Sequence, residues 1–173
     1  TSELVYVGDQ GTTQIRGASR RYGTELGTRL QLLNWLAFRG DLTLTHAEFR
    51  GTGQAVPLAP EMTGQAGLTA TLPNGLISSL QMIHMGRRPA DENRTAYAQS
   101  FTVFDWVNRY RLPVKAERGR WEAFFTVQNL FDTNWRQAQF FYESQLRGQS
   151  AQSDIHFVPG TPRNIMGGLA WYF

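Results

Sequence analysis

Hydrophobic and polar residues alternate along most of the chain. In the segment RYGTELGTRLQL (21–32), the even positions carry Tyr, Thr and Leu, while the odd positions carry Arg, Gly, Glu and Gln. The same period of two recurs in WLAFRGDLTLTHA (35–47) and TGQAGLTATL (63–72). Successive side chains of a strand point to opposite faces, whereas a helix would scatter these sets around its circumference. The pattern therefore predicts β-strands.

Five further segments show a less regular alternation, and they bring the predicted total to eight strands. These segments are 3–9, 75–85, 99–112, 120–132 and 162–173. An apolar band ~25 Å tall, crossed by strands tilted at about 40°, needs about ten residues per strand. All segments except the first meet this length. Asn108 interrupts the apolar row formed by Phe104, Trp106 and Tyr110, and we expect it near an interface.

The predicted connections alternate between short and long. Short connections lie around 33–35, at Pro73-Asn74-Gly75 and at 113–119, and Asn-Gly predicts a two-residue type I′ hairpin turn. Long connections cover 10–19, 51–61, 86–98 and 133–161. Short turns at one end and long loops at the other are typical of an outer-membrane β-barrel, with periplasmic turns and extracellular loops.

The composition agrees with a barrel that crosses a membrane by strands. The 173 residues have a mean hydropathy of −0.38 and contain no apolar run of ~18 residues that could form a transmembrane helix. Aromatic residues nevertheless make up 13% of the chain. Only one face of each barrel strand contacts lipid, so the polar face is expected to line the interior. The charged residues expected there are Glu25, Arg29, Arg39, Asp41 and Asp105.

Charge and motif content argue against several other classes of function. The net charge is only +3 and the basic residues form no run, so nucleic-acid binding has little support. The chain has no cysteine, and its three histidines, His46, His84 and His156, lack metal-ligand spacing. Catalytic and phosphate-binding motifs are absent from the sequence. We therefore expect neither an enzyme nor a metal site, and no cofactor.

Two segments near the end of the chain resemble TonB-dependent outer-membrane receptors. They are NLFDTNW (129–135) and DIHFVPGTPRNIMGGLAWYF (154–173). In that family an NLFD motif closes the penultimate strand, a long extracellular loop follows, and a PGxPR motif opens the last strand, which ends in an aromatic residue. Upstream, RYGTE (21–25) resembles the family's RGxE-like motif, and PLAPEMTGQAGL (57–68) resembles its entry into a strand.

The resemblance implies an all-β, antiparallel transmembrane barrel in the outer membrane of a Gram-negative bacterium. It implies that Leu169, Trp171 and Phe173 face lipid, close the sheet against its first strand and guide the barrel-assembly machinery. The implied surroundings are outer-membrane lipids and lipopolysaccharide. Residues 1–173 would form a single barrel domain or the C-terminal segment of a larger barrel. Nothing in them resembles the plug, through which alone TonB would act, or a signal peptide.

The last two long loops carry the candidate ligand-binding residues. Aromatic rings beside fixed cations suit an anionic, ring-bearing ligand such as a ferric siderophore. The candidates are Arg87, Arg88, Trp135, Arg136, Phe140, Phe141, Tyr142 and Arg147. Binding of lipopolysaccharide phosphates, or simple solvation of the loops, would explain the same arginines equally well.

Three functions remain open from the sequence. The first is a receptor barrel for TonB-dependent uptake of a scarce nutrient such as a ferric siderophore. The second is a self-contained eight-stranded barrel acting as an adhesin, an anchor or a small pore. The third is a soluble β-sandwich binding module, because strand alternation alone also fits a sandwich with one wet face.

Overall fold

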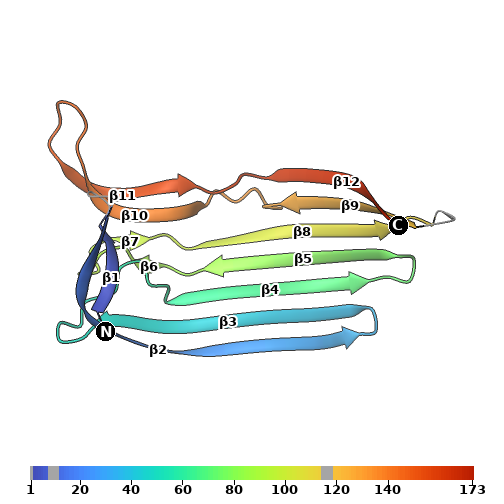
Figure 1. Ribbon diagram of the computed structural model, residues 1–173, viewed down its shortest axis with the longest axis horizontal. Helices are drawn as coiled ribbons and strands as arrows, with labels where there is room; N and C mark the ends of the chain where they lie inside the picture. Colours follow the sequence, from blue (N-terminus) through green and yellow to red (C-terminus); the bar gives the residue numbers. More distant parts are fainter. Residues whose placement is uncertain (1, 8–11, 114–118) are drawn as a thin grey trace.

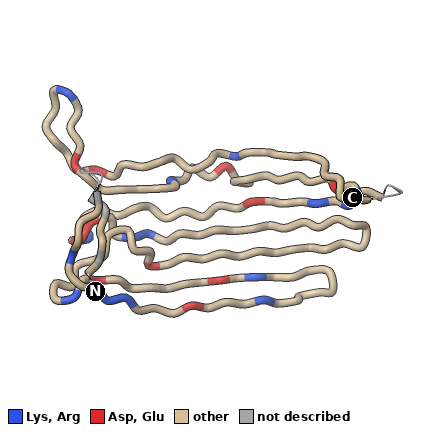
Figure 2. The backbone as a smooth tube through the Cα atoms, in the orientation of Figure 1, with Lys and Arg blue, Asp and Glu red and all other residues tan. Residues whose placement is uncertain are grey.

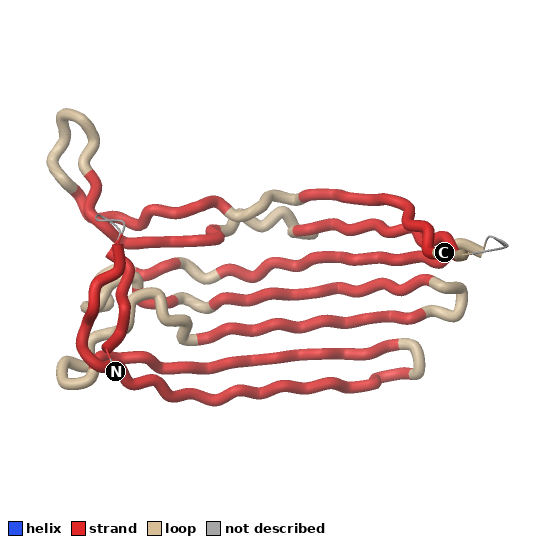
Figure 3. The backbone as a smooth tube through the Cα atoms, in the orientation of Figure 1, coloured by secondary structure: helices blue, strands red, loops and turns tan. Residues whose placement is uncertain are grey.

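The structure is a computed structural model that describes residues 2–7, 12–113 and 119–173. These residues form strands, turns and loops, and none of them belongs to a helix that is long and apolar enough to span a membrane (Figure 3). Eight strands make one antiparallel sheet in the order β1-β2-β3-β4-β5-β8-β9-β12. Their bounds are β1 Ser2–Val7, β2 Thr12–Leu33, β3 Leu36–Phe49, β4 Met62–Thr71, β5 Leu76–Met85, β8 Phe101–Arg111, β9 Arg120–Gln128 and β12 Asn164–Tyr172.

The sheet is curled and open, with its strands side by side along the long axis of the molecule (Figure 1). Within the described residues, β1 and β12 form its two edges, and β12 pairs only with β9. The two-residue turn between β2 and β3, the β4–β5 turn, the end of β8 and the start of β9 all lie at one end, which we call the turn end. The longer connections lie at the opposite end, the loop end. The predicted all-β antiparallel fold is confirmed, as are the short connections around 33–35 and 73–75 and the longer ones at 51–61 and 86–98. Most of the predicted short connection 113–119 lies outside the described residues.

One face of the sheet is apolar from β2 to β12. A single row of register partners crosses seven strands and holds only hydrophobic side chains. The row is Leu30, Phe38, Leu68, Leu80, Trp106, Val127 and Ile165. Most of these side chains are exposed, and Ile165 is 62% exposed. We call this surface the apolar face. Because cross-strand partners share a face, the alternation read from each strand combines into one continuous surface.

The last strand places its predicted anchor residues on the apolar face. Leu169, Trp171 and Phe173 are all exposed. The Trp171 ring stacks on Trp121 of β9, with centroids 5.9 Å apart, and lies 5.8 Å from the Phe173 ring. These rings gather at the turn end, as expected for an aromatic girdle at a membrane interface.

The opposite face is polar and concave. The register row next to the apolar one contains Arg29, Arg39, Gly67, Gln81 and Asp105. Gln128 and Asn164 pair with each other at the loop end of β9 and β12. A hollow of about 630 Å³ is lined by Arg29, Arg39, Asp41, Gln65 and Gln81, among others. Arg39 Nε lies 3.2 Å from Asp41 Oδ2 within it. The charged residues predicted to face the interior therefore lie on this polar face.

Asn108, which breaks the apolar pattern, has a hydrogen-bond partner on its own face of the sheet. Ser78 Oγ donates a hydrogen bond of 2.7 Å to Asn108 Oδ1, and Trp106 Nε1 donates one of 2.9 Å to Ser78 Oγ. Asn108 lies three residues before the end of β8, at the turn end. A polar pair at this level agrees with the expected position near an interface.

The predicted long connection over residues 10–19 is wrong for its described part. Residues 12–19 belong to β2, which runs for 22 residues and pairs with β1 over its first part. This half of β2 is polar in sequence, so its alternation is weak. A strand that extends beyond an apolar band needs no apolar face, which is why the hydrophobic pattern missed it.

The connection at 73–75 forms a hairpin turn, but the predicted type I′ turn is wrong. Gly75 has a φ of +88°, whereas Asn74 is not among the residues with positive φ. Gly75 N–H donates to Leu72 O at 3.1 Å, and Leu72 N–H donates to Leu76 O at 2.8 Å. This three-residue loop places Pro73 at the second position of its turn, where the fixed proline φ is favourable.

Most of the buried apolar residues lie at the loop end, at the end of β3 or in the connections beyond the sheet. They are Phe49, Ala55, Val56, Ala90 and Ala98, which we call the loop-end core; the other buried hydrophobic among the described residues is Val127 of β9. Two short strands, β6 Arg88–Pro89 and β7 Tyr97–Ala98, belong to this region. Ala55 N–H donates to Glu92 O at 2.9 Å and Leu58 N–H to Pro89 O at 2.7 Å, so the connection 50–61 is tied to 86–100.

Candidate functional site

A hairpin projects from the loop end of β9 and β12. It consists of β10 Arg136–Ser144 and β11 Gln152–Pro159, and its tip points away from the sheet (Figure 1). The segment 133–161, predicted as a long loop, is thus mostly strand. β9 also ends at Gln128, so the NLFD motif forms the turn after the strand and not its last residues.

The two motifs that carried the family resemblance bind each other at the base of this hairpin. Asn129, only 2% exposed, has a φ of +49°. Its Nδ2 donates to Thr133 O at 2.9 Å and to Thr161 O at 3.1 Å, and its Oδ1 accepts from Thr133 N–H at 2.8 Å. Asp132 Oδ1 accepts from Arg163 N–H at 3.0 Å. NLFD and PGTPR therefore join β9 to β12 where the hairpin leaves the sheet.

Trp135 forms part of the same base. Its Nε1 donates to Thr161 O at 3.1 Å, and its ring lies 4.7 Å from that of Phe101. A Cβ on Gly160 would come within 2.1 Å of the Trp135 ring, so only glycine allows this approach. Trp135 also lines a cavity of about 210 Å³, together with residues such as Asp105 and Gln128 whose side chains lie on the polar face of the sheet.

Gln139 attaches the hairpin to the neighbouring connection 86–100. Its side chain is 2% exposed, and its Oε1 accepts from Gln99 N–H at 2.9 Å. Its Nε2 donates to Gln99 O at 3.0 Å. The side-chain amide of Gln139 thus makes the same pair of hydrogen bonds to the Gln99 backbone that a neighbouring β-strand would make. The sequence offers no motif for either residue, because a glutamine in a polar segment is not distinctive.

The aromatic and basic candidates on the hairpin are spread along its length. Arg136 lies 4.0 Å from the centroid of the Phe157 ring, and Tyr142 stacks on His156 at 3.9 Å. The successive residues Phe140 and Phe141 point to opposite faces of β10.

Arg147 is exposed and lies between β10 and β11, toward the hairpin tip. It is therefore separated from Trp135, which lies at the hairpin base. The structure brings Arg136 and Tyr142 to partners that the sequence did not suggest, but it does not gather all the hairpin candidates into one pocket.

The other two arginine candidates lie in the connection 86–100. The Arg87 guanidinium lies 3.6 Å from the centroid of the Tyr97 ring, and both residues line a cavity of about 310 Å³. Arg88 is 7% exposed, and its Nη1 has no hydrogen-bond partner among the described residues. Burial lowers the pKa of Arg88 from its ordinary value. The two adjacent arginines thus have opposite environments.

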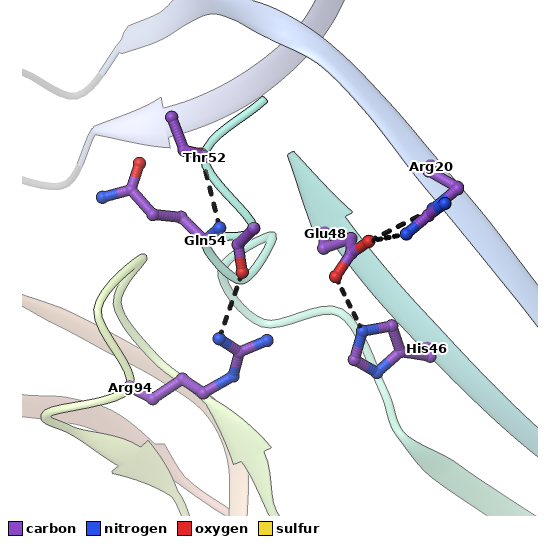
Figure 4. A network of polar contacts seen from close by, with 7 residues as sticks. Arg20, His46, Glu48, Thr52, Gln54 and Arg94 are labelled. Carbon is purple, nitrogen blue, oxygen red and sulfur yellow. Dashed lines mark hydrogen bonds and ion pairs between the residues drawn. The ribbon is translucent and has the colours of Figure 1, made fainter. Parts of the chain in front are cut away.

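A polar network surrounds the loop ends of β2 and β3 (Figure 4). Arg20 Nε donates to Glu48 Oε1 at 3.1 Å, and His46 Nε2 lies 3.2 Å from Glu48 Oε2. The hydrogen bond from Arg20, with a smaller contribution from that with His46, lowers the pKa of the Glu48 carboxyl. Arg94 Nη1 donates to Gly53 O at 3.3 Å and so links the two connections.

The three histidines make polar or ring-stacking contacts with neighbouring side chains. His46 belongs to the network above, and His84 Nδ1 lies 2.8 Å from Thr102 Oγ1. His156, expected in a loop, lies on β11. No three His, Cys, Asp or Glu residues gather into a possible metal site in the part of the chain that the structure describes.

An amphipathic curled sheet with short turns at one end and projecting loops at the other is the wall of a membrane barrel. Residues 2–130 match the family model described as TonB dependent receptor-like, beta-barrel. The chain belongs to this family. Barrels of this family reside in the Gram-negative outer membrane, so the loop end is extracellular and the turn end periplasmic. The soluble β-sandwich alternative is overturned.

Solved structures of outer-membrane receptors share the fold. The ferric yersiniabactin uptake receptor FyuA from Yersinia pestis has a TM-score of 0.68 at 18% identity, over 94% of this chain and 25% of its own. The ferric preacinetobactin receptor BauA from Acinetobacter baumannii has a TM-score of 0.68 at 17% identity, over 99% of this chain and 25% of its own. The copper transporter OprC has a TM-score of 0.69 at 21% identity, over 98% and 26%.

The chain thus spans about a quarter of the length of these structures. The matching family and structures are receptors and transporters, which confirms the prediction that the chain is not an enzyme. The named cargoes differ, since two are ferric chelates and one is copper. At these identities the similarity establishes the fold but does not identify a ligand. The ligand of this barrel has to be inferred from the residues of the chain itself.

Proposed function

We propose that this chain forms part of the wall of an outer-membrane receptor that takes up a scarce nutrient, such as a ferric siderophore, in a TonB-dependent manner. The observation that carries the proposal is the pair of opposite faces on one open sheet. Lipid would cover the exposed apolar face, while the polar face with its 630 Å³ hollow would enclose the transport path. Residues 1–173 would act as one continuous part of a larger barrel, completed by strands that pair with the edges β1 and β12.

The ligand would bind at the extracellular end, where aromatic rings and arginines occur together. Arg136 and Arg147 add positive charge to a hairpin whose Phe140, Phe141 and Tyr142 offer stacking surfaces. An anionic chelate with aromatic rings would be held by charge-assisted hydrogen bonds and stacking. Trp135 and Arg87 would act from the two cavities that they line below and beside the hairpin.

The apolar face and the two ends of the sheet indicate the proposed partners. Outer-membrane lipids would surround the apolar face, with Leu169, Trp171 and Phe173 anchoring the last strand at the periplasmic side and presenting it to the barrel-assembly machinery. Lipopolysaccharide would contact the apolar face near the loop end, in the outer leaflet of the membrane. TonB would act through a plug enclosed by the complete barrel.

Uptake of a radiolabelled ferric siderophore by cells tests the proposal. We expect uptake that depends on both this receptor and TonB. The double variant Arg136→Ala and Arg147→Ala should weaken siderophore binding to the cells by about tenfold, because two charge-assisted contacts are lost. The matched control is Arg109→Ala with Arg111→Ala, which removes two exposed arginines from the periplasmic end of β8.

The control variant should bind the chelate as the wild type does. Uptake that is unchanged in cells without TonB would contradict the proposed transport. Uptake that depends on TonB but is insensitive to the hairpin variant would keep the transport function and remove the hairpin as its ligand site.

A further inference from the structure

Two arginines lie opposite each other on the polar face of the sheet. Arg29 of β2 and Arg39 of β3 are direct register partners, and both line the hollow of about 630 Å³. Opposite positions of paired strands hold their Cβ atoms about 5 Å apart, and like charges at such positions repel each other. The pair therefore costs stability unless a negative group lies between its two guanidinium groups.

The hollow itself contains only part of the negative charge that this pair needs. Arg39 Nε lies 3.2 Å from Asp41 Oδ2, and no other acidic residue among the described ones lines the hollow. Within the described chain, the Arg29 guanidinium makes no ion pair or hydrogen bond, and the two Nη groups of Arg39 have no polar partner. Two guanidinium groups thus share one carboxylate, and most of their donors are unused.

The space beside the two arginines is open and contains further donors. Gly67 of β4 is the register partner of Arg39, and a Cβ on Gly67 would meet no atom within 4 Å. Gln81 of β5 is the next partner in this row, and both Gln65 and Gln81 line the hollow. A glutamine amide donates hydrogen bonds, and a guanidinium presents a planar fork that matches two oxygens of a carboxylate or phosphate group. The strands β2 to β5 therefore surround an open floor with donors suited to an oxyanion.

We propose that Arg29 and Arg39 form an oxyanion site on the inner wall of the barrel, which binds a carboxylate or phosphate group of the transported ligand during its passage. The inference rests on the proposed function and adds a second site to it, separate from the extracellular hairpin. Arg29 lies four residues before Leu33, the end of β2, so the site belongs to the periplasmic part of the wall. The transported compound is thereby narrowed to one that bears such an anionic group.

Isothermal titration calorimetry of the complete receptor, purified from outer membranes in detergent, tests the proposal with inorganic phosphate at low ionic strength. We expect saturable binding by the wild type, and the variant Arg29→Gln should bind phosphate at least about tenfold more weakly. Asp41→Asn should bind phosphate more tightly, by about threefold to tenfold, because it removes the negative charge that competes for Arg39.

The matched control is Arg109→Gln. Arg109 is an exposed arginine at the turn end of β8, on the same face as Asp105, and it does not line the hollow. This control should bind phosphate as the wild type does. The opposite directions expected for Arg29→Gln and Asp41→Asn separate a binding role from a structural one, because a loss of folding would weaken binding in both.

Three results would overturn the proposal: no phosphate binding by the wild type, equal affinity of the wild type and Arg29→Gln, or an equal loss in Arg109→Gln. Weaker binding by Asp41→Asn, after correction for the folded fraction from heat-modifiable gel mobility, would overturn it as well. The wild-type titration and Asp41→Asn remain decisive even if Arg29→Gln folds poorly.

Ferric citrate, a chelate rich in carboxylates, separates the two sources of the oxyanion. It should displace phosphate from the wild type and bind Arg29→Gln at least about tenfold more weakly, with Arg109→Gln unchanged. Phosphate binding that ferric citrate does not displace would show that the free anion alone occupies the hollow, and would overturn the assignment to the transported ligand. Phosphate binding without TonB-dependent uptake would reject the proposed function alone, whereas uptake without phosphate binding would reject the oxyanion site alone.

Discussion

At the scale of residues, two buried polar side chains at the extracellular end have opposite hydrogen-bonding states. Asn129 uses both its amide nitrogen and its oxygen, and its positive φ is tolerated because asparagine adopts this conformation more readily than most residues. Arg88 leaves Nη1 without a partner within the described chain. A satisfied group of this kind stabilises a structure, whereas an unsatisfied one costs free energy.

The substitution Asn129→Ala should destabilise the receptor by about 2–4 kcal/mol, because it leaves buried acceptors on Thr133 and Thr161 without their donor. The free energy of urea unfolding in detergent measures this effect. The control Asn164→Ala removes an exposed amide that bonds Gln128 on the polar face, and it should cost less than about 1 kcal/mol. Equal effects of the two substitutions would refute the role of the Asn129 contacts.

At the scale of elements, the hairpin β10–β11 is joined to the rest of the molecule at two places. The NLFD and PGTPR motifs hold its base, and Gln139 holds its middle against Gln99. The connections 50–61 and 86–100 are also bonded to each other, so the extracellular segments share one hydrogen-bonded framework. Such a framework presents ligand-binding side chains at low entropic cost, since little ordering remains for binding.

We expect Gln139→Ala to release the hairpin from the connection 86–100. The Gln99 amide should then exchange with deuterium at least about tenfold faster, because the loss of its side-chain acceptor costs about 1–2 kcal/mol. Hydrogen exchange of peptides that cover 97–101, followed by mass spectrometry, measures the change. Gln137→Ala, on an exposed position of the same strand, should leave the exchange unaltered. Identical rates in all three proteins would disprove this attachment.

At the scale of the whole molecule, the sheet has one face for lipid and one for water. Neighbouring residues of a strand therefore face different solvents, and β5 provides a direct comparison. Leu80, near the middle of β5, belongs to the apolar row, while Gln81 belongs to the polar row that lines the hollow. The cost of a charge should depend on this one-residue difference in position, because only the apolar face lacks water.

The substitution Leu80→Arg should destabilise the folded barrel by about 2–4 kcal/mol, the cost of an arginine at the bilayer midplane. Gln81→Arg should have an effect near zero. Denaturant titration of the receptor in lipid vesicles gives both values, and heat-modifiable gel mobility gives the folded fraction. A smaller cost for Leu80→Arg than for Gln81→Arg would show that the assignment of the two faces is reversed.

The predictions from sequence succeeded where the signal is local. The eight strands, the two faces and the short turns follow from the period of two and from residues such as Asn74 and Gly75. The polar half of β2 was missed because its residues 12–19 lie beyond the apolar band. The hairpin after Thr133 was missed because the apolar run Phe140–Tyr142 breaks the alternation in β10, and β11 begins with the polar residues 152–154. For the site, Arg87 and Arg88 were named as candidates, but their different environments depend on contacts with distant segments.

The sequence by itself determined that this protein is an amphipathic β-sheet, since alternation with period two requires only that each strand expose its two faces to different solvents. It also indicated the outer-membrane family, through the resemblance of the NLFD and PGTPR motifs and the terminal aromatic residue, and the family match over residues 2–130 established it. Only the tertiary structure decided that these two motifs bond to each other, that Gln139 ties the hairpin to Gln99, and that Arg88 is buried while Arg87 is not. Those outcomes depend on contacts between residues that are far apart in the sequence. The alternation within a single strand contains no information about such contacts.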